Sequence, residues 1–396
     1  MRKWFYIFML FSFAQCRDAY NVTPATNGNG SLVVEGILNA NGKTTINLSR
    51  TTRLSDKRIA PEIGALIVIE ASGGNIFLMR ELRGGGVYES DSLALDPAQK
   101  YRLRIQTLDN REYASDYRNY ISTPPIDSIS WEQDATGVKI FAHAHDNANS
   151  TRYYKLDYEE AWEFHSDYRA SLKFTPIDPG PDGVKFALEY IRPDQLTDPG
   201  LFTCYNDRIS TGINIVSTEN LGTSKVLYLI RSIPAASIEL SVLYSMKLKQ
   251  YALSKEGYEF FVKMKKNTET LGSIFDAQPT ELSGNITCLT DPSELVIGFV
   301  DVTTVETKRI FVSNESLDAW GYELGCKAFV EPDRMFSAYP YPNDPALFNH
   351  IAERDIVPTV PAETGPGGAV IKFYANNRIC VDCTMRGTNI KPDFWP

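Results

Sequence analysis

The sequence lacks several well-known catalytic motifs. It has no GxSxG nucleophile elbow, no GxxxxGK[ST] phosphate loop and no HExxH zinc motif. Histidine is scarce, and four residues in 396 leave few candidates for an imidazole general base. We therefore expect a protein that is not an enzyme and that needs no cofactor.

Clustered positive charge is lacking as well. The chain carries 40 Lys and Arg against 49 Asp and Glu, which gives a formal net charge of −9. Phosphate backbones are bound through clustered Lys and Arg. We expect no nucleic-acid partner.

Long hydrophobic runs are missing, and the one notable apolar run lies at the N-terminus. Trp4 to Ala14 is shorter than the roughly 20 apolar residues that cross a bilayer as a helix. With Arg2 and Lys3 before it, the run is typical of a secretory signal peptide over residues 1–15. Cys16 follows at the position where bacterial lipoproteins are acylated, so we predict a lipid such as palmitate on Cys16. The alternative is an ordinary signal peptide with Cys16 as one more cysteine.

The residues after Cys16 are polar and rich in Asn, Thr, Pro and Gly. Such a segment cannot bury enough apolar surface to fold. We predict a flexible tether over residues 16–30, with a root-mean-square span of about 20 Å. The lipid would anchor the folded body close to a membrane.

Cysteine usage indicates an oxidising compartment. Five cysteines follow Cys16, so at most two disulfides form among them and one thiol is left over; the candidates are Cys204, Cys288, Cys326, Cys380 and Cys383. Cys380-Val-Asp-Cys383 could instead be a zinc site or a redox pair. Structural zinc often uses two close ligand pairs, and the second pair is missing. A redox pair belongs at a helix start in a βαβ unit. Disulfides are the favoured interpretation.

The pattern of short Val, Ile, Thr and aromatic runs separated by turn residues predicts a mainly β fold. Tyr101-Arg-Leu-Arg-Ile105 alternates with period two, which is typical of a half-buried strand. We predict an immunoglobulin-like or transthyretin-like sandwich over residues 31–122, ended by Thr123-Pro124-Pro125. Its predicted strands are 31–36, 44–48, 65–70, 75–82, 87–90 and 101–107.

A larger β-rich domain is predicted over residues 125–396. One helix is expected near 255–271, with Ser254 as N-cap, Leu253 and Tyr258 as a hydrophobic staple and Gly272 at its end. From Asn314 onward the chain is rich in Pro, Gly and aromatics, and we expect irregular structure held by disulfides. The predicted strands are 126–129, 137–143, 152–164, 184–191, 226–249, 295–300 and 309–312, with a surface loop at 178–183.

Two local clusters are candidate sites. His143 and His145 share one face of a strand and could reach one metal, although two solvated histidines before a turn are the favoured interpretation. In the aromatic stretch that contains Tyr153, Tyr154, Tyr158 and Trp162, neighbouring acids could act as a glycosidase pair, and the aromatics could bind a sugar, a peptide or a partner. A packed strand with a solvated acidic face is the simpler alternative. The acids are Asp157, Glu159, Glu160 and Glu163.

Matching segments from end to end give a family resemblance. They include Val33-Val-Glu-Gly36, Pro125-Ile-Asp-Ser-Ile129, Tyr153 through Phe164, Gly272-Ser-Ile-Phe275, Lys308-Arg-Ile-Phe311, Cys380-Val-Asp-Cys383 and Lys391-Pro-Asp-Phe-Trp395. In these segments the chain resembles the Bacteroidota outer-membrane lipoproteins grouped as a domain of unknown function, DUF4249. Members of that group are often encoded beside SusC-like, TonB-dependent receptors.

The resemblance implies a lipid-anchored protein of the outer membrane, facing the cell surface and associated with a β-barrel transporter. The implied role is a non-catalytic accessory or binding module, with a peptide or glycan as ligand. The resemblance brings no catalytic residues with it. Two alternatives stay open: a structural component of outer-membrane protein or lipoprotein assembly, and a surface hydrolase that uses the acids named above.

Overall fold

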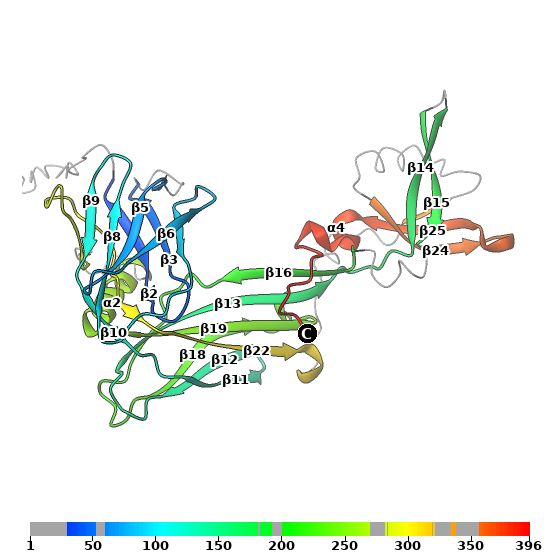
Figure 1. The fold of residues 1–396 in the computed structure, drawn as a ribbon. Coiled ribbons are helices and arrows are strands. Elements are labelled where there is room, and N and C mark those ends of the chain that lie inside the picture. Colours follow the sequence, from blue (N-terminus) through cyan, green and yellow to red (C-terminus); the bar gives the residue numbers. More distant parts are fainter. Residues whose placement is uncertain are drawn as a thin grey trace, which may run out of the picture.

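The computed structural model describes residues 30–52, 60–180, 183–191, 200–269, 282, 284–318, 320, 334–337 and 356–396. Figure 1 shows an elongated molecule in which an N-terminal sandwich, a central pair of sheets and a smaller C-terminal part follow one another. The predicted mainly β fold is confirmed. Within these ranges every helix is too short or too polar to cross a lipid bilayer.

The N-terminal sandwich is one hydrogen-bonded network of twelve strands that curls around a single core. The alternation predicted for 101–105 is confirmed, because Tyr101, Leu103 and Ile105 are buried while Arg102 and Arg104 point outward. All six predicted strands are present to within two residues. The chain builds β1 (Leu32–Gly36), β2 (Leu38–Asn39), β3 (Thr45–Arg50), β4 (Ala60–Pro61), β5 (Leu66–Ala71), β6 (Ile76–Leu82), β7 (Val87–Ser90), β8 (Lys100–Gln106), β9 (Glu112–Ser115) and β10 (Arg118–Ile121).

A distant segment completes this sandwich. β20 (Ile286–Cys288) pairs with β9, and β21 (Val302–Thr303) lies between β10 and β2. Residues 295–300, predicted as a strand, instead make a single bridge between Val33 and Ile297. The Asn285 side chain hydrogen bonds to both backbone groups of Val300, at 2.9 Å each, and so replaces the ladder there.

The central part is a second sandwich. A five-stranded sheet has the order β16-β13-β19-β22, with β17 also on β13, and it packs on a three-stranded sheet of order β11-β12-β18. The predicted strand 226–249 is broken, because Ala236 has a φ of 58° and a short 3-10 helix, η2 (Ile238–Leu240), follows it. The strands are β11 (Ile126–Asp134), β12 (Gly137–His145), β13 (Tyr153–His165), β16 (Thr203–Ile209), β17 (Ile215–Ser217), β18 (Lys225–Pro234), β19 (Leu243–Leu253) and β22 (Val305–Ser313), and η3 (Asn314–Ser316) ends the last of them.

The predicted helix is confirmed as α2 (Lys255–Glu269), and residues 270–272 lie outside the described ones. Ser254 caps it, because its Oγ accepts a hydrogen bond from the Gly257 backbone N–H at 3.0 Å. The buried Asp301 carboxylate in turn accepts from Ser254 Oγ and N–H. This contact joins the helix to the segment that returns to the N-terminal sandwich.

The C-terminal part corrects the expectation of irregular structure. A sheet of order β23-β25-β24 is formed by β23 (Arg334–Ser337), β24 (Ile356–Thr364) and β25 (Val370–Asn377), beside a hairpin of β14 (Leu172–Gly180) and β15 (Gly183–Tyr190). Of the predicted loop at 178–183, residues 178–180 belong to β14 and Gly183 begins β15, and residues 181 and 182 lie outside the described ones. Pro358 and Pro361 interrupt the register of β24. Proline donates no ladder hydrogen bond and is rare within strands, so the sequence of β24 resembles that of a loop. Three short helical turns also occur, η5 (Pro366–Gly368), α4 (Arg378–Val381) and η6 (Cys383–Met385).

Candidate functional site

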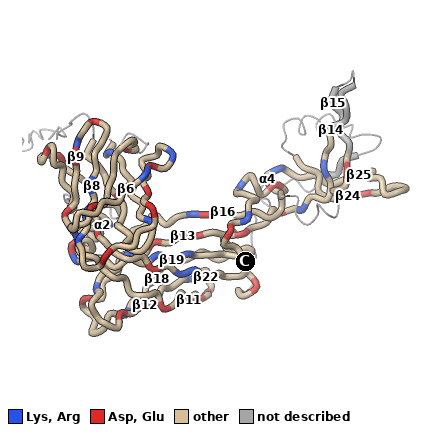
Figure 2. Tube along the Cα trace, viewed as in Figure 1, with Lys and Arg blue, Asp and Glu red and all other residues tan. Residues whose placement is uncertain are grey.

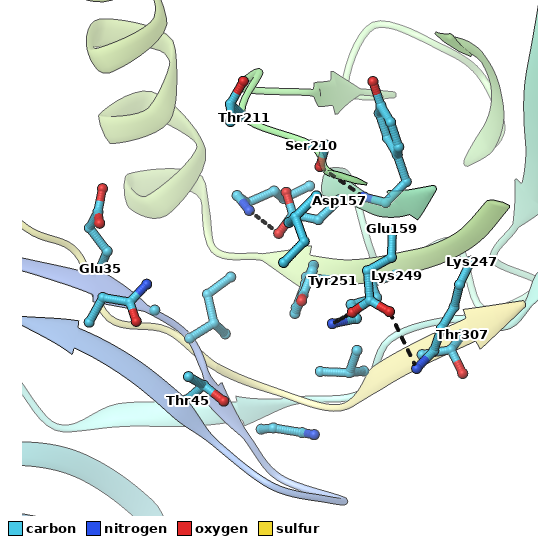
Figure 3. A pocket seen from close by; sticks show the side chains of 18 of the residues that line it. Glu35, Thr45, Asp157, Glu159, Ser210, Thr211, Lys247, Lys249, Tyr251 and Thr307 are labelled. Atoms are coloured by element: carbon cyan, nitrogen blue, oxygen red, sulfur yellow. Dashed lines mark hydrogen bonds and ion pairs between the residues drawn. The ribbon is translucent and has the colours of Figure 1, made fainter. Parts of the chain in front are cut away.

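A cleft of about 760 Å³ lies where the N-terminal sandwich meets the open face of the five-stranded sheet (Figure 3). β1, β2 and β3 form one wall, and β13, β19 and β22 form the floor. The loop after β16 closes a third side. The cleft is lined by Glu35, Gly36, Ile37, Asn39, Asn41, Lys43, Thr45, Asn47, Lys155, Asp157, Tyr158, Glu159, Ile209, Ser210, Thr211, Gly212, Ile213, Lys247, Lys249, Tyr251, Val305 and Thr307.

The wall depends on a glycine at the junction of β1 and β2. Gly36 has a φ of 147°, and a Cβ there would lie 2.5 Å from the Thr45 carbonyl oxygen. Only glycine adopts this backbone conformation without strain. The kink lets β2 turn toward β21 while β1 stays paired with β3. The wall is fixed to the floor by Asn41, whose Oδ1 accepts a hydrogen bond from the Val305 N–H at 3.0 Å.

The floor carries opposite charges on neighbouring strands. Lys247 and Lys249 on β19 lie across from Glu159 and Asp157 on β13, and Figure 2 shows these strands side by side. Glu159 forms a close ion pair with Lys249, and its Oε2 is 3.9 Å from Lys247 Nζ. Two ammonium groups therefore share one carboxylate.

A second ion pair on the floor joins one lysine to one aspartate, so its charges cancel. Lys155 pairs with Asp157, two residues away on the same face of β13. Its Nζ also lies 5.3 Å from the ring centre of Tyr251 and 5.6 Å from that of Phe261, which is within the range of cation–π attraction. These contacts hold the Lys155 head group in place.

The Glu159 carboxyl is held in its ionised form. Burial alone would raise its pKa, but the hydrogen bond from Lys249 and the charges of Lys249, Lys247 and Arg309 outweigh burial, so the pKa lies below its ordinary value. A glycosidase acid needs a raised pKa to stay protonated. Asp157 and Glu159 do share the cleft, as the hydrolase alternative requires, but each is ion-paired with lysine.

Glu160 points away from the cleft into the central core, where it is 2% exposed. Its Oε1 accepts hydrogen bonds from Tyr244 Oη at 2.7 Å and Arg231 Nε at 3.1 Å. Its Oε2 accepts from Arg208 Nε at 2.8 Å. Glu160 was predicted to lie among the surface acids, so this role in the core was not predicted. Period-two alternation was the available signal, because its face of β13 is otherwise Leu156, Tyr158, Trp162 and Phe164.

The aromatic residues predicted as a ligand or partner surface lie mainly in cores. Tyr154 is fully buried, and Tyr153 and Trp162 are 8% and 7% exposed. Tyr158 is partly buried against the central core. Tyr153 stacks on Tyr258 of α2, and Tyr154 Oη shares a hydrogen bond with Ser224 Oγ. Tyr153, Tyr154 and Trp162 therefore do not form the predicted ligand or partner surface, because they are packed in cores, whereas Tyr158 also lines the cleft.

The two strand histidines are held separately by β11. His143 Nε2 lies 2.7 Å from Ser130 Oγ, and His145 Nδ1 lies 2.7 Å from Asp127 Oδ2. The hydrogen bond and the charge of Asp127 raise the pKa of His145. Among the described residues, no group of three or more His, Cys, Asp or Glu side chains could hold a metal ion.

Disulfide formation is confirmed for Cys204 and Cys383, which join β16 to η6. Cys380 is also disulfide-bonded, so the two cysteines of the Cys380-Val-Asp-Cys383 motif do not form a redox pair with each other. Cys288 is a buried free thiol. Cys16 and Cys326 lie outside the described residues.

The C-terminal residues lie on the same sheet face as the cleft. Trp395 is buried, donates a hydrogen bond from Nε1 to Glu163 Oε2 at 2.9 Å and packs edge-on against Tyr205 and Phe311. Phe394 stacks on Arg309, with the guanidinium carbon 3.6 Å from the ring centre. The Glu163 carboxylate therefore binds the C-terminal tail.

Fold and cleft together define a two-sandwich β protein with a charged cleft between its sandwiches. The chain belongs to the family described as a domain of unknown function (DUF4249), whose profile matches residues 18–309. Every residue that lines the cleft falls within this match, whereas Cys383 and the C-terminal tail lie beyond it. Comparison with curated proteins finds no match.

Proposed function

We propose that this protein is an outer-membrane lipoprotein of Bacteroidota, anchored at the cell surface through Cys16, that serves a SusC-like, TonB-dependent transporter as a non-catalytic binding accessory. The observation that carries the proposal is the cleft between the two sandwiches. Ligand sites favour such junctions and typically have volumes of roughly 300–1,000 Å³, and this cleft falls within that range. Its ion-paired acids suit recognition better than catalysis.

Export and anchoring are supported by the N-terminal residues and by the disulfide. Arg2, Lys3 and the following apolar run lead to Cys16. The Cys204–Cys383 disulfide fits an oxidising compartment outside the cytoplasm. The residues between Cys16 and Gly30 reach about 50 Å at full extension. The N-terminal sandwich would therefore stay close to the bilayer and to proteins embedded in it.

Replacing Cys16 with alanine is expected to remove the lipid and to release the protein from membranes. The test is metabolic labelling with an alkyne-tagged palmitate, followed by fractionation of the envelope. The matched control is Cys288→Ala, which removes a buried thiol and should keep both label and membrane association. Continued labelling or sedimentation of the Cys16→Ala protein would contradict lipid anchoring.

An exposed apolar face on the N-terminal sandwich supports docking to a membrane-embedded barrel. Leu66, Ile76 and Leu78 point outward from β5 and β6 and are 52%, 64% and 55% exposed. Val68 lies opposite Leu78, so the apolar surface is continuous across both strands. The outer face of an antiparallel sheet is normally polar, and contiguous exposed apolar surface usually marks an interaction site.

Replacing Leu78 with glutamate is expected to reduce recovery of the barrel with the tagged protein by about tenfold, because a charge would be buried in an apolar contact. Co-purification in mild detergent with quantitative mass spectrometry measures this. Leu227→Glu on β18 is the control, since Leu227 is also exposed but lies on the other sandwich. Equal loss in both variants would overturn docking through β5 and β6, as would a change only in self-association measured by light scattering.

A further inference from the structure

The cleft floor has a local excess of positive charge in an acidic chain. Glu159 lies close enough to Lys249, Lys247 and Arg309 that all three lower its pKa. Arg309 belongs to the same sheet face, directly across from Lys247. Three cations therefore act on one carboxylate, whereas the whole chain has a formal net charge of −9.

The other charges of the cleft leave this excess in place. Lys155 and Asp157 neutralise each other, and Lys43 pairs with Glu89 at 2.7 Å. Glu35 belongs to the opposite wall, on β1 (Figure 3). The uncompensated positive charge therefore lies at the end of the floor formed by Lys247 and Lys249.

Both lysine head groups are accessible to a ligand. The side chains of Lys247 and Lys249 are 36% and 31% exposed, and that of Glu159 is 34% exposed. Charges in a partly enclosed cleft are screened less than charges on an open surface. Thr307 and Asn47 line the same cleft and offer neutral hydrogen-bonding groups. Such a combination favours a polar ligand that carries a negative charge.

We propose that the cleft binds a ligand through a carboxylate placed between Lys247 and Lys249, with Glu159 as the built-in counter-ion with which the ligand competes. This inference rests on the proposed binding function and names its ligand class. A carboxylate accepts charge-assisted hydrogen bonds from two ammonium groups. The same chemistry is found at the C-terminus of a peptide and in an acidic sugar.

The test is calorimetric titration of the full-length protein in detergent. The first pair of probes is tetra-alanine with a free C-terminus and the same peptide amidated. The second pair is trigalacturonate and its methyl ester. The proposal predicts binding of at least one acid and at least tenfold weaker binding of its neutral partner, and the pair that responds identifies the source. Failure of both acids to bind, or equal binding of acid and neutral forms, would overturn it.

Variants that neutralise a charge in the cleft are expected to change the affinity for the acid in opposite directions. The double variant Lys247→Gln/Lys249→Gln should weaken binding of the responding acid at least tenfold, whereas Glu159→Gln should strengthen it several-fold because the competing carboxylate is removed. Lys139→Gln, on β12 and paired with Asp134, is the matched control and should leave binding unchanged. Weaker binding by Glu159→Gln would contradict the proposal.

These measurements separate the ligand class from the proposed accessory role. Loss of the barrel partner with acid binding intact would reject the transporter role alone. A retained barrel partner without acid binding would reject the ligand class alone. Thermal unfolding of each variant checks folding, and we expect little change because all three side chains are partly exposed.

Discussion

Glu160→Ala is expected to lower the free energy of unfolding of the central sandwich by about 3 kcal/mol. Removing one partner of a buried ion pair costs about 3–5 kcal/mol. We expect the lower end of this energy range because the Arg208 and Arg231 side chains are 43% and 26% exposed. Water can therefore partly hydrate them once the carboxylate is gone. Tyr244 Oη would lose its acceptor in the same core.

Urea unfolding followed by tryptophan fluorescence measures this effect, because Trp162 lies against Arg208. The matched control is Glu159→Gln, one residue away on the opposite face of β13. Its carboxylate is half-buried and faces the cleft, so we expect a loss below about 1 kcal/mol. Similar losses for the two variants would contradict the assignment of Glu160 to the core and Glu159 to the cleft.

Removing the disulfide with Cys204→Ala/Cys383→Ala is expected to cost about 2–5 kcal/mol. The bond joins residues 179 positions apart, so its loss greatly enlarges the ensemble of unfolded conformations. It also holds the C-terminal tail near β16, where Tyr205 and Thr388 form an isolated bridge. Without the bond, Trp395 should leave its site on the sheet more often.

Limited trypsin digestion with intact-mass analysis follows the tail directly, since Arg386 is a cleavage site within it, whereas Pro392 blocks cleavage after Lys391. We expect rapid cleavage after Arg386 in the double variant and slow cleavage in the native protein. The Cys288→Ala variant lacks only an unpaired buried thiol, and trypsin should cleave it at the native rate. A double variant as resistant as the native protein would show that noncovalent contacts alone retain the tail.

Local patterns in the sequence were sufficient to predict most individual strands. Period-two alternation located β8, and the pattern of short apolar and aromatic runs between turn residues located β7. The N-cap of α2 followed from Ser254 and the apolar residues around it. The buried face of α2 was predicted less well: the sequence pattern places Tyr258, Phe261, Val262 and Lys265 on one face, yet Val262 is 40% exposed and Phe260 is buried. A short amphipathic helix does not specify how it is rotated against two neighbouring layers.

The tertiary organisation could not be predicted from the same patterns. Residues 285–303 return to the N-terminal sandwich through pairings with β9, β10 and β2, and no local signal specifies a partner so distant in the sequence. The cleft could not be predicted either, because it brings together residues as distant in the sequence as Thr45 and Lys247. Glu160 could have been distinguished from Glu159 by strand alternation, but its partners Arg208 and Arg231 come from two other strands.

The most direct test of the proposed role is to recover the tagged native protein from outer membranes in mild detergent and to identify its partners by quantitative mass spectrometry. We expect one TonB-dependent barrel in stoichiometric amount, retained by the Leu227→Glu variant and depleted in the Leu78→Glu variant. Recovery of the protein alone, or together with components of outer-membrane assembly, would contradict the proposed role.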